Sequence, residues 1–388
     1  MHDRSNPKVR SDEVSLDIER VLDRFVQSLE RKLDQAEQAT NKRSVILDTG
    51  NYLSRIGLEI IFSVFYNKQN EIDFDAVTDK WVAQIERVIQ MMVTPGFLLV
   101  RSLPFICPLA DWLLKLRFHL IGQVSNSLLG FVHEVIDSRR SARGKNANSE
   151  RKLISHKSAK DMAVKEAEGQ PGHKRRTMDE FADAVIEGKI SREQFVGSAY
   201  FVLFAGFETT AGTVTCLLWL LAKNPDIQIN LRGAIVEEGI DSEYVMWCIM
   251  ETLRWHPAVP LGVGRVLGED VTTNDGLLLP KGTFVMPSIY SIHHDETIWP
   301  EHEKFIPDRW RRQSEFHPAA FLGFGLGPRN CPGGKMAIHE IKLIIKAILV
   351  RYRVESCETT PHDYDFFSPL LITAIPEKPV NLRFSPLD

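Results

Sequence analysis

The chain has 388 residues, of which 44% are hydrophobic and 25% are charged. These proportions are typical of a globular protein and exclude a disordered, collagen-like or coiled-coil chain, while the length suits one large domain or two to three domains of about 150 residues each. The net charge of −4 at pH 7 provides no global field that would attract nucleic acid, so we expect no nucleic-acid partner.

The chain contains five cysteines and no C-x-x-C pair of the kind that holds zinc or a redox disulfide. This sparse and odd usage indicates a reduced, cytosol-facing protein. No run of eighteen or more uncharged apolar residues occurs, and the first residues lack the apolar core of a signal peptide. Nothing therefore clearly predicts a membrane-spanning helix. The cysteines are Cys107, Cys216, Cys248, Cys331 and Cys357.

Helical periodicity dominates the first third of the chain. Residues 16–36 carry apolar side chains at helical spacing and predict an amphipathic surface helix, and the same pattern predicts helices over 46–66, 75–92 and 113–138. Residues 91–114 are apolar but interrupted by prolines, so we expect them either to lie on a membrane surface or to form an internal apolar lid. The apolar positions of the first helix are Ile18, Val21, Leu22, Phe25, Leu29 and Leu33.

Residues 138–176 differ in composition from the rest of the chain. They contain twelve basic and four acidic residues and few large apolar ones. Such a charge run usually stays solvated, so we expect a charged flexible loop between two helices. Contact with lipid headgroups or with an acidic partner is the alternative.

A long helix is predicted to begin near the middle of the chain. Ser191 and Gln194 form a capping-box pattern, and the next proline is Pro225, which permits one helix of about thirty residues. Its middle, residues 200–221, is apolar on nearly every side, so we expect it to be buried.

Shorter elements are predicted after Pro225. A second helical stretch precedes Pro257, and residues 271–283 predict a short hairpin that turns at Asn274, Asp275 and Gly276. Residues 335–352 then predict a last amphipathic helix. Its apolar positions are Ile338, Ile341, Ile344, Ile345, Ile348 and Leu349.

The segment from Phe324 to Gly333, just before that last helix, is the most specific stretch of the sequence. Its glycines permit tight turns, and amides of the turn and of the helix N-terminus could point toward the sulfur of Cys331. Such surroundings favour a thiolate. A single thiolate suits an axial ligand of haem iron, which needs only one protein atom, and suits zinc poorly.

Four motifs that follow one another along the chain resemble those of the cytochrome P450 family. They look closest to those of its microsomal, drug-metabolising branch in animals. The resemblance implies a mainly α, single domain over residues 1–388 with a small β part, lacking the N-terminal anchor and first helices of full members. The motifs are Phe324, Gly327, Arg329, Cys331 and Gly333 of the cysteine loop, Ala205 to Thr210 of the long helix, Glu251 with Arg254, and Phe305 to Trp310.

The resemblance also implies a haem site. Cys331 would bind the iron, Arg265 and Arg329 would pair with the haem carboxylates, and Phe324, Gly327 and Gly333 would shape the loop. For Arg265, a pair with some Asp or Glu is the alternative. On the long helix, Ala205 and Gly206 would lie close to the cofactor, and Thr209, bonded to the carbonyl of Ala205, would deliver protons together with Glu208. Candidates for the substrate wall are Phe204, Ala205, Val259, Leu261 and Val263.

Glu251 and Arg254 lie three residues apart on one helical face. As an exposed pair they would contribute only about 0.2 to 0.5 kcal/mol. Buried with Arg309, as the resemblance implies, they would form a charge-assisted network that fixes the fold near the cysteine loop. We expect these residues to be structural.

The resemblance implies electrons from NADPH through a separate flavoprotein reductase and a lipophilic small-molecule substrate. It also implies a location on the cytosolic face of the endoplasmic reticulum membrane, or in the cytoplasm if the anchor is absent. No G-x-G-x-x-G or Walker pattern occurs in the sequence. Lys335, Lys342 and Lys346 fall near one side of the last helix and could receive an acidic reductase, or could simply be solvated. We expect His293 and His294 to be loop residues and not metal ligands.

The implied activity is insertion of one oxygen atom from dioxygen into the substrate. The main alternative is an inactive fragment or a haem-binding relative that does not turn over substrate. A cysteine hydrolase that uses Cys331 is a third class, although no histidine is placed by a recognisable motif to assist it.

Overall fold

The computed structural model describes residues 7–66, 68–69, 72–76, 81, 130, 133–141, 177–365, 373–374 and 376–387. The expected surface segment 91–114, all of the charged loop beyond residue 141, and most of the helices expected over 75–92 and 113–138 lie outside these residues. The chain divides into two compact units, Met1–Asp17 with Leu58–Ala205 (unit 1) and Ile18–Gly57 with Gly206–Asp388 (unit 2). The single domain over 1–388 stays a prediction.

The first two helices lie where the periodicity placed them, with different bounds. Helix α1 (Pro7–Thr40) contains the predicted 16–36, and all six of its predicted apolar positions are buried. The helix predicted over 46–66 begins later, as α2 (Thr49–Tyr66). Strand β1 (Val45–Asp48) takes its first residues because they pair with the far end of the chain.

Unit 1 is held together by an ion pair and by packing of aromatic rings. Helix α6 (Thr177–Ile186) presents Asp183, which accepts a hydrogen bond from Arg139 Nη2 at 2.8 Å. The Tyr66 hydroxyl donates to the carbonyl of Ala199 at 2.8 Å. Residues 133–141 are helical, so residues 138–141 do not belong to a loop as predicted. Asp75 lies in a bend and does not begin a helix.

Helix α7 (Arg192–Lys223) confirms the long helix. The capping box forms as predicted: the amide of Gln194 donates to Ser191 Oγ at 3.2 Å, and the amide of Ser191 donates to Gln194 Oε1 at 2.7 Å. The expected burial is wrong for its first half, because Phe201 is 67% exposed. Residues 210–221 are buried. Among the described residues, α7 is long and apolar enough to cross a membrane, yet most of its apolar window is buried inside the protein.

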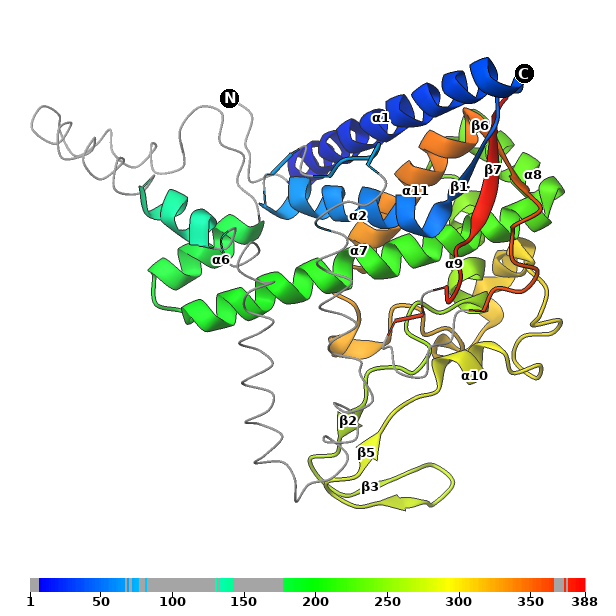
Figure 1. The fold of residues 1–388 in the computed structure, drawn as a ribbon. Helices are drawn as coiled ribbons and strands as arrows, with labels where there is room; N and C mark the ends of the chain where they lie inside the picture. The colour runs from blue at the N-terminus through cyan, green and yellow to red at the C-terminus, as the bar shows by residue number, and fades with distance from the viewer. Residues whose placement is uncertain are drawn as a thin grey trace, which may run out of the picture. The chain divides into compact units, whose positions relative to one another are not determined.

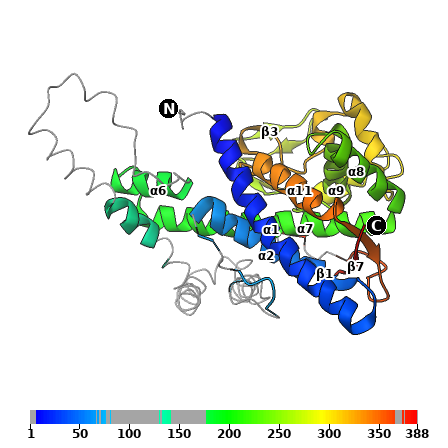
Figure 2. The same ribbon diagram turned by 90° about the horizontal axis from the view of Figure 1, so that it is seen from above.

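Three helices of unit 2 pack against one another. They are α8 (Pro225–Glu237), α9 (Glu243–Trp255) and α11 (Gly334–Leu349), and they lie together in Figures 1 and 2. The isoleucines of α11 from 341 onward form its buried face, as the periodicity predicts. The helix ends at Leu349, three residues earlier than expected, because Tyr352 begins a strand.

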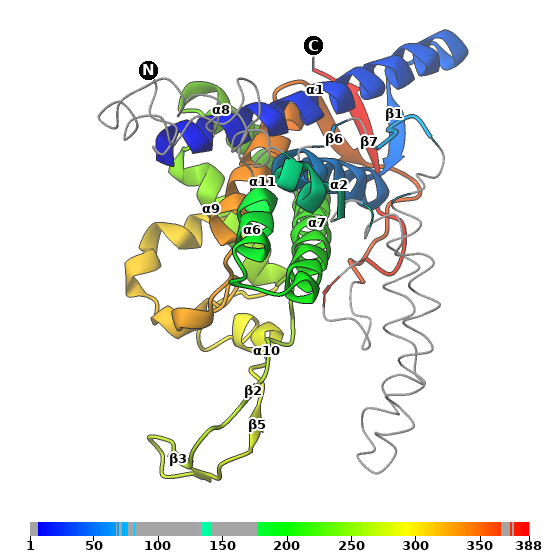
Figure 3. The ribbon, with the colours of Figure 1, turned by 90° about the vertical axis from the view of Figure 1, so that its left-hand side faces the viewer.

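The β part of unit 2 consists of one three-stranded sheet and two short hairpin pairs. Strands β1, β7 (Asn381–Pro386) and β6 (Tyr352–Ser356) form an antiparallel sheet in that order. Strand β2 (Arg265–Val266) pairs with β5 (Phe284–Val285), and β3 (Val271–Thr272) pairs with β4 (Leu278–Leu279). These hairpins extend away from the helices (Figures 1 and 3). The predicted turn between β3 and β4 is confirmed, with Gly276 at φ +87°.

A buried carboxylate joins α9 to the 3-10 helix η2 (Pro307–Glu315). Glu251 accepts two hydrogen bonds from the Arg254 guanidinium at 3.0 Å each and one from Arg309 Nε at 2.9 Å. The indole of Trp310 and the amide of Ile306 donate to it at 3.0 Å each. Glu251 and Arg254 are completely buried. The predicted network with Arg309 is therefore confirmed.

We predict that Glu251→Gln lowers the free energy of unfolding by about 3 to 5 kcal/mol, because it leaves the Arg254 guanidinium buried without a counter-charge. Urea unfolding followed by circular dichroism measures the change. The matched control is Glu358→Gln, which removes an exposed partner of Arg383 and should cost less than about 1 kcal/mol. Equal losses in the two variants would contradict a special role for the buried network.

A second buried carboxyl lies on α11. Glu340 is 1% exposed, and its Oε1 has no hydrogen-bond partner. Burial raises the pKa of Glu340 to about 8. The folded chain therefore keeps a proton on this side chain at neutral pH that the unfolded chain releases.

This pKa sets the sign of a pH effect. Between pH 4.5 and 8 the folded state binds more protons, so this group's contribution to the free energy of unfolding falls by about 1.4 kcal/mol per pH unit as pH rises. Glu340→Gln should remove that slope, so the variant gains stability over the wild type from pH 5 to pH 8 in urea unfolding. Glu355→Gln, at an exposed position of β6, is the control. A constant difference between Glu340→Gln and the wild type across this range would contradict the assignment.

Candidate functional site

The cysteine loop is shaped by two glycines and by backbone hydrogen bonds. The amide of Cys331 donates to the carbonyl of Phe324 at 2.8 Å, and the amide of Gly325 donates to that of Leu322 at 2.9 Å. Gly325 and Gly327 have φ of +71° and +78°, which side chains with a Cβ rarely adopt. A 3-10 turn, η4 (Gly327–Arg329), begins at the second of these glycines and precedes Cys331. The glycines thus close the loop back on itself, as their spacing suggests.

The loop also packs against the start of α11. A Cβ on Gly334 would lie 3.2 Å from Cδ1 of the Phe324 ring, so this ring sits directly on the helix backbone. A Cβ on Gly333 would lie 4.0 Å from Cys331 Sγ. Of the predicted site residues, Gly333 thus lies next to the cysteine sulfur, and the Phe324 ring packs on the first residue of α11.

Cys331 is accessible to solvent. Among the described residues its Sγ makes no hydrogen bond, so the expected amide donors are not seen on the sulfur. A backbone held by hydrogen bonds thus presents an unpartnered sulfur atom. This arrangement suits a ligand to a metal that approaches from outside the loop.

Two arginines of the predicted site are available to an anion. Arg265 and Arg329 are exposed, and within the described part of the chain neither forms an ion pair with a carboxylate. Arg265 Nη1 donates to the carbonyls of Val263 and Gly264 at 3.0 Å each. The alternative of an Asp or Glu partner for Arg265 is therefore not seen among these residues.

The α7 motif lies against a segment near the C-terminus. Glu208 accepts a hydrogen bond from the Thr373 hydroxyl at 2.7 Å. The neighbouring Ala374 comes close to α7, because a Cβ on Gly212 would lie 3.3 Å from its carbonyl oxygen. Thr373, Ala374 and Gly212 were not singled out by sequence reasoning, and no local pattern marks them, since the contact joins segments 165 residues apart.

Threonines of α7 bond back to the helix backbone. The hydroxyl of Thr210 donates to the carbonyl of Gly206 at 3.1 Å, and that of Thr213 donates to the carbonyl of Thr209 at 2.8 Å. The bond of Thr210 is of the same kind as the one expected between Thr209 and Ala205. The bond of Thr209 itself stays a prediction.

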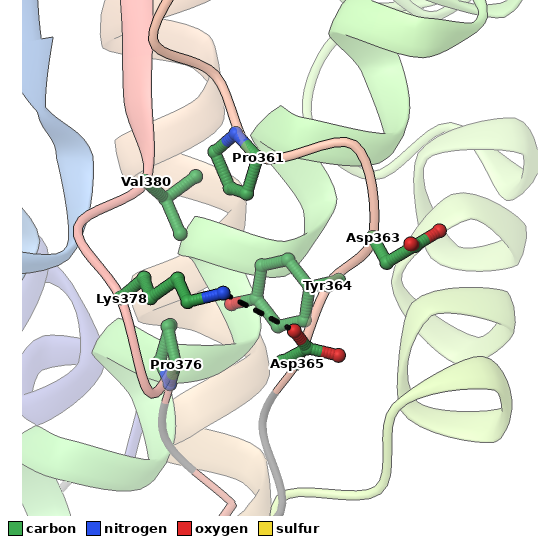
Figure 4. A pocket seen from close by; sticks show the side chains of 7 residues that line it. All are labelled: Pro361, Asp363, Tyr364, Asp365, Pro376, Lys378 and Val380. Carbon is green, nitrogen blue, oxygen red and sulfur yellow. Dashed lines mark ion pairs between the residues drawn. The ribbon is translucent and has the colours of Figure 1, made fainter.

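A small hollow lies beside this region, between Tyr364 and Val380 (Figure 4). Lys378 and Asp365 form an ion pair across it at 3.8 Å. Its volume of about 10 Å³ suits no more than one water molecule. The Tyr364 ring packs on Trp219 and His256, so the hollow is a packing feature and is too small for a substrate.

Two expectations on individual residues are corrected. Lys342 is not on an open basic face, because it is nearly buried and its Nζ pairs with Asp241 at 2.9 Å. Only Lys335 and Lys346 of the three lysines are exposed. His293 is not a loop residue but the buried last residue of α10 (Ile289–His293). Within the described ranges no group of three or more His, Cys, Asp and Glu residues could hold a metal ion.

The residues present fit a haem. The donor set comprises one unpartnered thiol and two guanidinium groups without carboxylate partners, which match an iron and two carboxylates in kind. Apolar side chains close to these arginines in the sequence are also exposed to solvent. Leu326 is 61% exposed and Val263 is 68% exposed. Of the expected substrate wall, Leu261 is also exposed and Val259 is half-buried. An apolar, flat ligand with two anionic groups would satisfy this set.

The model of one protein family, described as cytochrome P450, matches residues 1–384. The chain belongs to the cytochrome P450 family. The mainly α fold with a small β part is confirmed by this match and by the observed elements.

Similar P450 proteins come from several animals. Cytochrome P450 3A40 of Oryzias latipes is 26% identical over 381 residues, which is 93% of this chain and 68% of that protein. Cytochrome P450 4A7 of Oryctolagus cuniculus is 28% identical over 85% of this chain and 63% of that protein. Cytochrome P450 3A31 of Mesocricetus auratus is 32% identical over 51% of this chain and 42% of that protein. The alignments thus span between about two fifths and two thirds of these P450 relatives.

We predict that Cys331 is alkylated much faster than the buried cysteines. Burial raises the pKa of the Cys216 and Cys248 thiols and excludes reagent, whereas Cys331 is exposed. A short iodoacetamide pulse followed by peptide mass spectrometry measures each site. Added haemin should protect Cys331 and leave Cys357, which is half-buried, unchanged. Equal protection of both thiols would show nonspecific shielding and contradict the site.

Proposed function

We propose that this chain is a haem-thiolate monooxygenase that inserts one oxygen atom from dioxygen into a lipophilic small molecule. The observation that carries the proposal is the exposed, unpartnered thiol of Cys331 on a glycine-shaped loop at the start of α11. Membership of the P450 family supports it. Haem, when bound, supplies the activation of dioxygen, and the thiolate favours cleavage of the oxygen–oxygen bond.

The residues of the loop bind and orient the cofactor. Cys331 supplies the thiolate to iron, and the hydrogen bond from its amide to Phe324 O fixes where the residue stands. Arg265 and Arg329 pair with the two carboxylates, since both guanidinium groups are exposed and lack an acidic partner in the described part of the chain. Ala205 and Gly206 offer little or no side chain, which lets a flat group approach α7.

Residues of α7 transfer protons to the site. Glu208 is held by the Thr373 hydroxyl at 2.7 Å, so its carboxyl group has a fixed position from which to exchange a proton with water. Thr209 follows it directly and is half-buried. A hydroxyl and a carboxyl at adjacent positions form a relay from the protein surface toward the site.

The partners follow from the same assignment. Because the chain carries no dinucleotide motif of its own, electrons come from NADPH through a separate flavoprotein reductase. Lys335 and Lys346 are exposed on α11 and offer two cations to an acidic reductase surface. The uncovered side chains of Leu261 and Val263 favour a lipophilic substrate. We place the protein on the cytosolic face of the endoplasmic reticulum membrane, with contact to the membrane surface.

An inactive fragment or a non-catalytic haem-binding relative is the competing function. The carbon monoxide difference spectrum of the reduced, purified chain separates these cases. A Soret band at the position typical of thiolate-ligated haem supports the monooxygenase, and absence of haem supports the fragment. Turnover of a lipophilic substrate with added reductase then separates the enzyme from a silent haem binder.

Cys331→Ala should abolish thiolate-ligated haem, because it removes the only atom proposed to bind iron. Haem content and the reduced carbon monoxide spectrum measure the effect. Cys357→Ala is the matched control, since it removes a half-buried thiol at the end of β6. Unchanged haem content and an unchanged Soret band in Cys331→Ala would overturn the assignment.

A further inference from the structure

His293 lies between the buried ion network and the cysteine loop. It ends α10 and is completely buried. Its ring stacks on Phe321, with 5.2 Å between ring centroids and 2° between planes. It also meets the edge of Trp299 at 6.5 Å. The ring is therefore fixed in one orientation by its neighbours.

Two hydrogen bonds connect this residue to both sides. Its backbone carbonyl accepts from Arg254 Nη1 at 3.0 Å, which ties it to the network of Glu251. Its ring Nε2 accepts from the amide of Leu322 at 2.9 Å. Since the donor is a backbone amide, Nε2 carries no proton, and the ring proton sits on Nδ1.

The connection continues into the loop. The carbonyl of Leu322 accepts from the Gly325 amide at 2.9 Å, and the carbonyl of Phe324 accepts from the Cys331 amide at 2.8 Å. A short series of hydrogen bonds thus leads from the buried arginine, through the imidazole, to the residue that bears the thiol. The amide of Leu322 has its acceptor in His293.

We infer that His293 is a positioning residue, whose neutral imidazole accepts from Leu322 and thereby anchors the beginning of the loop that presents Cys331. The consequence for haem binding rests on the proposed function. The anchoring itself concerns this chain alone and can be measured without haem.

The protonation state agrees with this role. Burial, followed by the charge of Arg254, lowers the pKa of His293 to about 3. The ring therefore stays neutral at physiological pH, and Nε2 keeps the lone pair that accepts the hydrogen bond. If the ring were protonated, Nε2 would carry a hydrogen that faces the N–H of Leu322, and this hydrogen bond could not form.

The test compares variants that differ in whether an acceptor reaches Leu322. His293→Leu removes the acceptor, His293→Asn carries one on a shorter side chain, and His293→Gln carries one at nearly the distance of Nε2. The matched control is His256→Leu, because His256 is also completely buried, with its pKa also lowered to about 3 by burial, and its ring bonds to Ala374 instead.

Hydrogen–deuterium exchange of the full haem-free chain is the main measurement. We expect the amides of Leu322, Gly325 and Cys331 to exchange about tenfold faster or more in His293→Leu and His293→Asn, because the part-buried amide of Leu322 loses its acceptor and the loop that follows it opens more often. His293→Gln should keep wild-type protection, and His256→Leu should leave these three amides unchanged. If His293→Leu fails to fold, the Asn and Gln pair decides.

The second readout is the spectrum after haemin titration and reduction under carbon monoxide. His293→Asn should lose part of the thiolate-type Soret band, and His293→Gln should retain it. Equal exchange in the Asn and Gln variants, or equal loosening of the loop in His256→Leu, would overturn the inference. If the wild type itself gives no thiolate-type band, the proposed function fails, while the exchange data still decide the role of His293.

Discussion

The fold of unit 2 depends on one carboxylate, that of Glu251. It lies in the protein interior and accepts hydrogen bonds from two guanidinium groups, an indole and a backbone amide. Burial of a charge is costly unless it is paired and fully hydrogen-bonded, and here both conditions are met. The result is that α9, η2 and the segment leading to the cysteine loop are fixed to one another.

The same arginine that pairs with Glu251 also reaches outward. Arg254 donates to the carbonyls of His293 and Lys304, at 3.0 and 3.2 Å, and its guanidinium lies 5.9 Å from the ring centroid of Trp299. Lysine has no planar fork and could not make these contacts together. The backbone around Cys331 is therefore held by hydrogen bonds, while among the described residues its sulfur forms none.

Local patterns predicted the elements whose causes are local. The apolar spacing of α1, the capping box of Ser191 and the turn at Gly276 depend on residues a few positions apart, and all three are confirmed. Strand β1 was missed because its cause is the pairing of Val45 with Phe384, at the other end of the chain. The burial of Lys342 was missed for the same reason, since its partner Asp241 precedes it by 101 residues.

The candidate site shows the same division. The cysteine loop and the α7 motif were recognisable because their residues are close in sequence and resemble a family pattern. The contact of Thr373 with Glu208 and the anchoring of Leu322 by His293 join distant segments. His293 and His294 are adjacent in the sequence, and nothing there indicates which of the two is buried. In the structure His293 is buried, and the ring of His294 packs on Tyr290 and His302.

The threonines of α7 have a mechanical consequence. Hydroxyls of Thr210, Thr213 and Thr215 each add a second donor to a carbonyl four residues earlier, and such sharing weakens the helix ladder and favours bending. Within this 32-residue helix, the ladder is therefore weakened at the carbonyls of Gly206, Thr209 and Ala211, each of which accepts a bond from a threonine hydroxyl.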